Sequence, residues 1–324
     1  MANQRVKFTI GGSLGMTWEQ VLNVVTTAEE LGFEGYHPSD HFTPNQPFAL
    51  NEDMLEAYTL LATAAGHTTK LRLGAIVSPV MFRHPVLVAK AVTTLDHVSG
   101  GRAMLGLGIG NYDREYEAFD VPYPSFRERA EHLEETLQIA KALFSQERTT
   151  MQTKHYHLQD APFDPKPVQQ PHLPILLAGG SKRVMRLAAQ YADDWNCFGI
   201  IDDLTRKRHE IDEMCREIGR DPSTLTASRQ IMLVLSDDPA VIGEAVERVS
   251  DRLAANPAHA ALMEQRGKAV MARDFALIGS VEEVKDSIGR WAKAGVTHFN
   301  INWPRPANRP MMERFMAEVA SAFK

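Results

Sequence analysis

Cysteine is nearly absent from this chain, since Cys197 and Cys215 are the only two among 324 residues. Two cysteines do not supply a disulfide framework, and they are too few for a cysteine zinc site. So little cysteine is typical of a protein from a reducing compartment, and we expect a cytoplasmic location.

Long apolar runs and an excess of basic residues are also missing. No stretch is apolar for long enough to cross a bilayer, and the opening segment MANQRVKFTI lacks the basic region and apolar run of a secretory signal. The formal net charge of -6 gives no support for nucleic-acid binding. We therefore expect neither membrane nor nucleic-acid partners.

What the chain does have is a regular alternation of strand-like and helix-like segments. The strand-like segments are residues 6–12, 34–39, 71–78, 103–110, 174–180, 193–199, 225–235 and 295–303. The helix-like segments lie between Thr17 and Gly32, at 54–66, 84–98 and 125–144, and between Ser280 and Gly295. In the segment 84–98, for example, Val88, Val92, Leu95 and Val98 recur at helical spacing.

This alternation predicts right-handed βαβ units and a parallel sheet. The sheet either closes into a (β/α)8 barrel or stays open and doubly wound. A barrel typically takes ~250 residues and more with insertions, and no flexible linker divides the chain, so we favour a single barrel domain over residues 1–324. Residues 145–173 and 236–276 break the rhythm and are predicted insertions. The first is rich in Pro and His, as in a loop that covers a site.

The segment SDHF places Asp40 and His41 where the second predicted strand ends. Functional residues gather at the carboxyl ends of strands in both kinds of sheet. A His there is suited to giving or taking a proton near neutral pH. The alternative is a loop in which His41 binds backbone and Asp40 caps a turn.

Two glycine-containing segments are further candidates. Gly106, Gly108 and Gly110 lack the spacing of the dinucleotide fingerprint, so they indicate either close packing or the approach of a cofactor at a barrel mouth. The segment AGGSKR (178–183) ends a strand and opens a helix, whose free N–H groups bind anions such as phosphate. Its Lys182 and Arg183 either add donors or are solvated helix surface. Neither a metal-binding His pattern nor a serine-hydrolase elbow is present, so no metal site is predicted.

Five segments in order resemble the luciferase-like monooxygenase and deazaflavin-dependent oxidoreductase superfamily. They are GFEGYHPSDHF (32–42), LRLGAIVSPVMFRHPVLVAKAVTTLDHVSGGRAMLGLGIG (71–110), FRERAEHLEETLQIAKALF (126–144), PILLAGGSKRVMRLAAQYADDWN (174–196) and IGSVEEVKDSIGRWAKAGVTHFNI (278–301). The resemblance implies a (β/α)8 barrel, usually a homodimer, that binds FMN or coenzyme F420 at its mouth and acts on a small-molecule substrate.

Within that family the SDHF segment is similar to the F420-dependent branch. By this comparison His41 handles the substrate proton, Asp40 lies beside the deazaflavin ring, and the Ile76–Val77 peptide is cis. The cofactor-binding residues implied are Asp40, Ile76, Val77, Ser78, Gly108, Gly110, Asn111, Ala178, Gly179, Gly180 and Ser181. Trp303, Phe42 and the 145–173 loop are candidates for an apolar cover.

One departure limits the comparison. Related sugar-phosphate dehydrogenases carry a partner Glu at the position of Asn111, and an Asn does not exchange a proton usefully. Whether Asp113 or Glu115 replaces that acid stays open. We therefore predict an F420-dependent oxidoreductase of unidentified substrate. The alternatives are an FMN-dependent monooxygenase on the same barrel, a cofactor-free binding protein and, more distantly, an NAD-dependent Rossmann enzyme.

Overall fold

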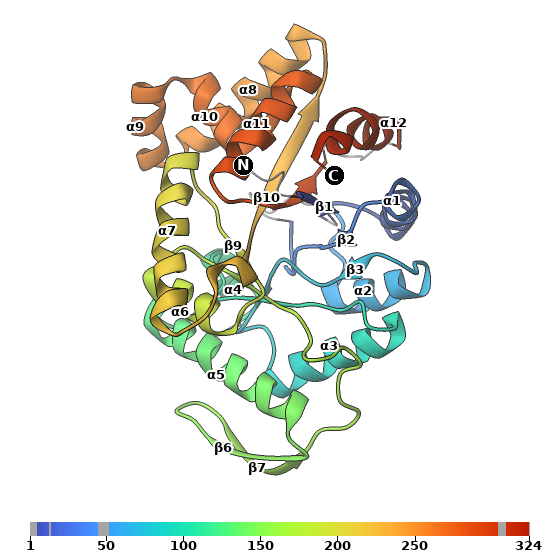
Figure 1. The fold of residues 1–324 in the computed structure, drawn as a ribbon, viewed down its shortest axis with the longest axis vertical. Coiled ribbons are helices and arrows are strands. Elements are labelled where there is room, and N and C mark those ends of the chain that lie inside the picture. Colours follow the sequence, from blue (N-terminus) through green and yellow to red (C-terminus); the bar gives the residue numbers. More distant parts are fainter. Residues whose placement is uncertain (1–4, 13, 45–51, 304–308, 324) are drawn as a thin grey trace.

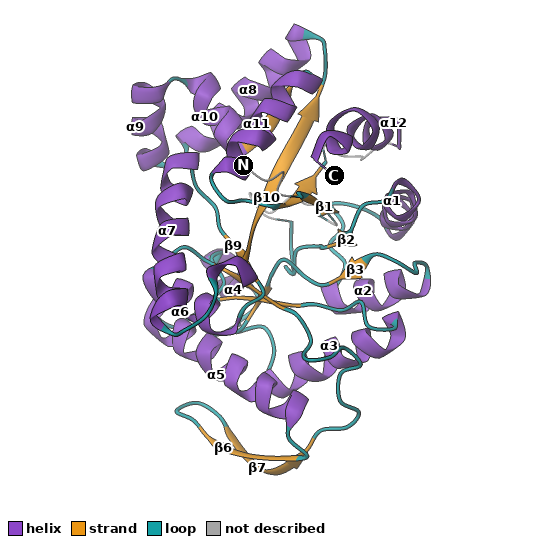
Figure 2. Ribbon diagram, viewed as in Figure 1, coloured by secondary structure: helices purple, strands orange, loops and turns teal. Residues whose placement is uncertain are grey.

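The computed structural model describes residues 5–12, 14–44, 52–303 and 309–323. Parallel strands occupy the centre of the molecule and helices lie around them (Figure 1). The strands of this sheet are β1 (Lys7–Ile10), β2 (Gly35–Tyr36), β3 (Arg72–Leu73), β4 (Ser78–Pro79), β5 (Leu105–Gly108), β8 (Ile175–Ala178), β9 (Asp194–Asn196), β10 (Thr226–Leu235), β11 (Ala276–Gly279) and β12 (His298–Asn302). Figure 2 distinguishes them from the helices by colour.

The helices follow the strands along the chain. They are α1 (Trp18–Leu31), α2 (Ala57–Gly66), α3 (Pro85–Ser99), α4 (Asp113–Ala118), α5 (Phe126–Ser145), α6 (Lys182–Tyr191), α7 (Ile201–Glu217), α8 (Pro239–Ala254), α9 (Pro257–Arg266), α10 (Lys268–Phe275), α11 (Val281–Lys293) and α12 (Arg309–Arg314). Short 3-10 and π segments, η1 (Pro222–Thr224), η2 (Phe315–Val319) and η3 (Ala320–Phe323), complete the set.

The sheet closes on itself as the predicted barrel. Its hydrogen-bonded order runs β3-β2-β1-β12-β10-β9-β8-β5-β4. The two end members, β3 and β4, are halves of one continuous segment, and a parallel bridge joins Leu73 to Ala103 just before β5. The same stretch of chain therefore pairs with β2 on one side and with β5 on the other. The prediction of a (β/α)8 barrel is confirmed.

Local sequence signals set the helix ends. Thr17 with Gln20 forms a capping box at the start of α1, and Gly32 ends that helix in the left-handed region with a φ of 82°. Ser280 with Glu283 forms the same box at the start of α11. These pairs satisfy N–H groups that a helix leaves without partners in its first turn.

Several details differ from the sequence-based expectation. Val98 is 55% exposed, and Ser99 takes the buried position at the end of α3. Residues 111–124, which lie between the predicted strand 103–110 and the predicted helix 125–144, contain α4. Residues 236–276, predicted as an insertion that breaks the rhythm of strands and helices, hold three helices and the start of β11, which pairs in parallel with residues 232–235 of β10. That the chain is one domain with two insertions stays a prediction.

Residues 145–173 contact both ends of the barrel, and that they cover the site stays a prediction. The ring centre of Tyr156 lies 5.2 Å from that of His84, which caps the start of α3 after β4. Residues 145–173 form the antiparallel hairpin β6 (Arg148–Gln152) and β7 (His157–Pro162), which Figure 1 shows beside α5, and a following segment that contacts the amino end of the barrel. The side chain of Gln169, for example, donates to the carbonyl of Ala103, ahead of β5. The reason is that α5 runs back along the barrel, so the chain leaving it emerges at the amino ends of the strands.

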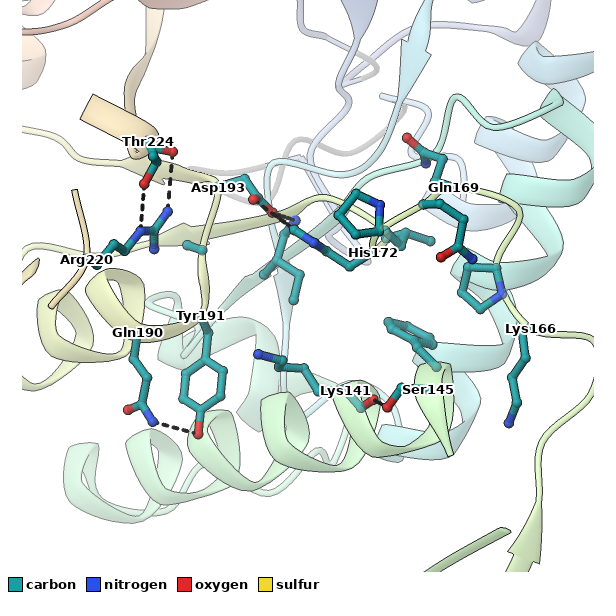
Figure 3. Close-up of a pocket in the computed structure, with 17 residues that line it drawn as sticks. Lys141, Ser145, Lys166, Gln169, His172, Gln190, Tyr191, Asp193, Arg220 and Thr224 are labelled. Atoms are coloured by element: carbon teal, nitrogen blue, oxygen red, sulfur yellow. Dashed lines mark hydrogen bonds and ion pairs between the residues drawn. The ribbon is translucent and has the colours of Figure 1, made fainter. Parts of the chain in front are cut away.

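A cavity of about 800 Å³ lies at this amino end, between α5 and the starts of β8 and β9 (Figure 3). His172 pairs with Asp193 on one wall, and Tyr191 and Lys141 lie on another. The cavity is remote from His41, because β8 and β9 run from its edge towards the mouth. Within the described residues, no helix is both long and apolar enough to cross a membrane.

Candidate active site

Asp40 and His41 leave the end of β2 towards different partners. The Asp40 carboxylate accepts a hydrogen bond of 2.6 Å from the Ser78 hydroxyl, at the end of the neighbouring strand segment. Arg83 binds both oxygens of the same carboxylate. Asp40 is only 2% exposed, so this is a charge pair held in the protein interior.

Arg83 joins Asp40 to a second carboxylate and to a ring. Its Nη2 lies 2.5 Å from an Oε1 of Glu56, and its guanidinium carbon lies 5.0 Å from the centre of the Tyr58 ring. Burial would lower the pKa of Arg83, but its bonds to Asp40 outweigh this and raise it. Burial also raises the pKa of Tyr58 above its ordinary value. Arg83 therefore stays charged and Tyr58 stays neutral, which fixes Asp40 rigidly.

His41 points to a buried glutamate. Its Nδ1 lies 2.7 Å from Oε2 of Glu115, which is fully buried. The other oxygen, Oε1, accepts the backbone N–H groups of Phe42 and Thr43, the latter at 3.1 Å. One carboxylate thus orients the imidazole and holds the loop that carries it.

This contact shows which acid lies beside the histidine. Glu115 meets His41, whereas Asp113 is exposed and its carboxylate binds the backbone N–H of Arg114. Asn111, where the related enzymes carry a Glu, is exposed. Sequence spacing did not separate Asp113 from Glu115, since only the direction of the short helix α4 turns one inward and the other outward.

The predicted cis peptide Ile76–Val77 is confirmed. It lies between β3 and β4 and beside the glycines of β5. A Cβ on Gly106 would stand 1.9 Å from the carbonyl oxygen of Ala75, and one on Gly108 would stand 2.7 Å from a methyl of Val77. These two glycines permit close packing of adjacent strands, which is the packing alternative raised from the sequence.

Gly110 has a different requirement. Its φ of 76° is in the left-handed region, and a Cβ there would stand 1.9 Å from the Tyr116 hydroxyl. Glycine is needed for both reasons. The tight turn leads the chain from β5 directly into Asn111 and α4, and so delivers Glu115 to His41.

A cradle suited to an anion lies at the start of α6. Gly179 has a φ of 147°, its carbonyl accepts a 2.8 Å hydrogen bond from the Trp195 ring, and Ser181 caps the helix through a bond to the N–H of Val184. The ammonium of Lys207, on α7, lies 2.7 Å from the place where a Cβ would stand on Gly180. The missing side chain at Gly180 and the N–H groups of the first helical turn leave room and donors for a phosphate.

Lys207 was not among the cations expected from the sequence. It pairs with Asp203 at 2.7 Å and is 18% exposed. Arg183, for which the sequence left open a donor or a solvated helix surface, faces α5, where it lies 3.5 Å from Glu134. Lys207 stands 27 residues after Gly180 in a different helix, so no motif links the two. Ala178, the last residue of β8, leads into the cradle.

Two buried amide oxygens also lie at strand ends. Within the described part of the chain, neither Oδ1 of Asn196, at the end of β9, nor Oδ1 of Asn302, at the end of β12, has a hydrogen-bond partner. Buried polar atoms without partners are rare in proteins and are one sign of a ligand site. Trp303, by contrast, packs on Phe33 and Phe315 in the core, so it does not belong to the apolar cover predicted for it.

Comparison with known proteins assigns the family. A model described as luciferase-like monooxygenase matches residues 4–298. The chain therefore belongs to the luciferase-like monooxygenase family and is an enzyme of that family. One relative is the F420-dependent glucose-6-phosphate dehydrogenase of Kineococcus radiotolerans, which is 28% identical over 309 residues, covering 90% of this chain and 89% of that protein.

Solved structures show the same barrel. An F420-dependent secondary alcohol dehydrogenase in complex with an F420-acetone adduct superposes with a TM-score of 0.84 at 20% identity, covering 99% of each chain. The coenzyme F420-dependent tetrahydromethanopterin reductase of Methanopyrus kandleri superposes with a TM-score of 0.80 at 20% identity, covering 99% of this chain and 100% of that one. At this identity the likeness speaks for the fold alone.

Proposed function

We propose that this chain is an F420-dependent oxidoreductase that transfers a hydride between the deazaflavin and a small organic substrate. The observation that carries the proposal is the His41–Glu115 pair at the carboxyl end of the barrel. It offers one oriented proton donor or acceptor, which is what the protein itself must add to hydride chemistry. The names of the relatives, F420-dependent dehydrogenases, support the cofactor.

In this proposal His41 gives or takes the substrate proton. An ionised carboxylate is an acceptor only, so Glu115 binds the proton on Nδ1 and leaves exchange with the substrate to Nε2. Glu115 is a positioning residue, and its bonds to the N–H groups of Phe42 and Thr43 hold the ring in place. Asp40, fixed by Arg83 and Ser78, forms a rigid edge of the site.

The chain also offers suitable contacts for the cofactor. Gly179, Gly180, Ser181 and Lys207 would bind its phosphate, and the amide oxygens of Asn196 and Asn302 are candidates for its polar groups. When bound, the deazaflavin accepts or supplies the hydride. We assign Ile76, Val77, Ser78, Gly108, Gly110, Asn111 and Ala178 to the same site as residues that shape its walls.

An FMN-dependent monooxygenase is the second candidate. The cradle at Gly180 suits the phosphate of either cofactor, and the family takes its name from luciferase-like monooxygenases. The two candidates differ in their reaction with oxygen. A reduced flavin passes electrons to oxygen, whereas the deazaflavin serves as a hydride carrier.

A binding titration of the purified protein with F420 and FMN, read by cofactor fluorescence, tests the proposal. We expect F420 to bind and FMN to bind at least tenfold more weakly. Lys207→Met should weaken the binding of F420 and leave unchanged the binding of a deazaflavin that lacks the phosphate. Lys285→Met, on α11, is the control and should bind F420 as the parent does. Tight FMN binding with oxygen consumption would favour the monooxygenase, and binding of neither would reject both.

We further propose a homodimer and a cytoplasmic location, on the resemblance to the family and the scarcity of cysteine. Light scattering on a sizing column measures the mass directly. A mass of one chain, 36.2 kDa, would reject the dimer.

A further inference from the structure

An aromatic cluster stands beside His41. Phe42 stacks on Phe82 with ring centres 4.3 Å apart, and it lies 5.3 Å from Phe119. Phe82 in turn lies 5.1 Å from Tyr116. We call these four rings, Phe42, Phe82, Phe119 and Tyr116, the aromatic shelf. They come from three separate segments of the chain, so their meeting is a product of the fold.

The shelf is continuous with the candidate catalytic residues. Phe42 follows His41 directly, and its N–H binds Glu115. Tyr116 follows Glu115 in the same helix. The carboxylate that orients the imidazole therefore also sets the position of the shelf relative to it.

Part of the shelf is open to solvent. Phe42 is 38% exposed and Phe119 is 50% exposed. A single exposed aromatic ring is ordinary, but contacting aromatic rings beside a polar site are typical of ligand pockets. Aromatic rings also gain from stacking with another ring, which points to the kind of ligand that would cover them.

Carboxylates outnumber cations in the segment that carries Tyr116 and Phe119 of the shelf. Residues 113–120, DREYEAFD, carry four carboxylates and one cation. Glu115 is buried against His41, while Asp113, Glu117 and Asp120 are exposed. Carboxylates around a site repel anions, so a substrate with a phosphate or carboxylate would be disfavoured at this face.

We infer that the substrate is an uncharged alcohol or ketone with an aryl or other bulky apolar substituent, which covers the aromatic shelf while its oxygen meets His41. This inference rests on the proposed function. In the oxidative direction the carbinol C–H bond breaks and its electron pair leaves as hydride to the oxidised deazaflavin. The O–H proton passes to His41 and the carbon–oxygen double bond forms; reduction is the reverse.

The first test measures binding without turnover. Acetophenone is titrated into the protein without cofactor and its contact followed by saturation-transfer NMR, with glucose 6-phosphate as the anionic comparison. We expect acetophenone to bind and Phe119→Ala to weaken it about three- to tenfold, as expected for loss of an aromatic contact. Ile218→Ala, at a similarly exposed apolar residue just after α7, should leave acetophenone binding unchanged.

A second set of variants tests the charge. Glu117→Gln with Asp120→Asn should leave acetophenone binding unchanged and improve binding of glucose 6-phosphate. Equal affinity of the parent protein for both ligands, or no effect of Phe119→Ala, would overturn the inference.

The cofactor-loaded enzyme separates this inference from the proposed function. Conversion of 1-phenylethanol with F420, faster than that of glucose 6-phosphate, supports both. Faster oxidation of glucose 6-phosphate overturns the substrate class and leaves the F420 proposal standing. If F420 does not bind but acetophenone binding is still weakened by Phe119→Ala, the role of the aromatic shelf in substrate binding is supported and the cofactor proposal fails.

Discussion

Oε2 of Glu115 lies 2.7 Å from Nδ1 of His41, across 74 residues of chain. The same carboxylate accepts N–H groups from Phe42 and Thr43, so it is bound by three donors of one loop. Glu115 belongs to a helix of six residues that begins just after β5. The position of His41 thus depends on the turn at Gly110 and on the register of that short helix.

Replacing Glu115 should separate orientation from loop stability. A Glu115→Gln variant keeps an oxygen for the N–H groups of Phe42 and Thr43 but loses the charge facing the ring. We expect cofactor affinity and KM near the parent values and kcat lowered about tenfold or more, since general acid–base catalysis contributes ~10²–10⁴-fold. Steady-state kinetics and cofactor titration measure both quantities.

The control is Glu117→Gln, two residues further in the same helix and exposed. It should behave as the parent enzyme. Glu115→Ala should lower thermal stability as well as kcat. An unchanged kcat in Glu115→Gln would remove the carboxylate from its positioning role.

Replacing His41 tests the proton-transfer assignment directly. His41→Ala should bind the cofactor as the parent does and turn over ~10²–10⁴-fold more slowly. If this variant binds cofactor and turns over at the parent rate, His41 does not carry the proton.

The buried pair of Asp40 and Arg83 should dominate local stability. Asp40→Ala leaves the Arg83 guanidinium, only 13% exposed, without its main partner. Loss of one partner from a buried pair costs ~3–5 kcal/mol of unfolding free energy. Denaturant titration measures this cost.

The surface pair of Arg148 and Asp160 is the comparison, because its side chains are 51% and 67% exposed. Asp160→Asn should lower the free energy of unfolding much less than Asp40→Ala does, because exposed ion pairs contribute little, and Asn tolerates the φ of 47° found there. Equal costs for the two variants would contradict a buried charge network at Asp40.

Two glycines should respond differently to the same substitution. Gly106→Ala would bring a Cβ to 1.9 Å from a backbone carbonyl, that of Ala75, so strands must shift and the melting temperature should fall markedly. Gly180→Ala would meet the flexible end of Lys207, which can move aside, and would stand 3.1 Å from the Cys197 sulfur, a much smaller overlap than the one at Gly106. That variant should melt near the parent temperature and bind the cofactor more weakly, as calorimetry and titration would show. A stable Gly106→Ala protein would be inconsistent with this packing.

His37 should make stability depend on pH. Burial, and then the neighbouring His298, lowers its pKa to about 3 from 6.5. The folded protein therefore keeps His37 neutral where the unfolded chain binds a proton, so stability is full above pH 6.5 and is lost as the pH falls towards 3. The contribution is on the order of a few kcal/mol.

His37→Gln, whose amide can still donate to the carbonyl of Gly74, tests this dependence. Urea unfolding is measured between about pH 4 and 7, which lies largely between the folded and unfolded pKa values of His37. As the pH falls, the free energy of unfolding should decrease less steeply in the variant than in the parent protein. An identical slope in both proteins would assign the pH dependence to other groups.

Much of the architecture was predictable from local patterns. The capping pairs Thr17–Gln20 and Ser280–Glu283 each act over three residues, and the alternation of strands and helices implied a parallel barrel. The rule that parallel strands present functional residues at their carboxyl ends also pointed to Asp40 and His41. These signals are readable because their physical causes lie within a turn of helix or one strand.

The partners of those residues were not predictable. Glu115 for His41, Arg83 for Asp40 and Lys207 for Gly180 each come from another segment of the chain, and closure of the barrel alone brings them together. Composition likewise does not say at which end of the barrel residues 145–173 begin, because that depends on the direction of α5. The sequence by itself determined the fold and the strand ends; the tertiary structure decided which charges meet there, because contact depends on the path of the backbone through space.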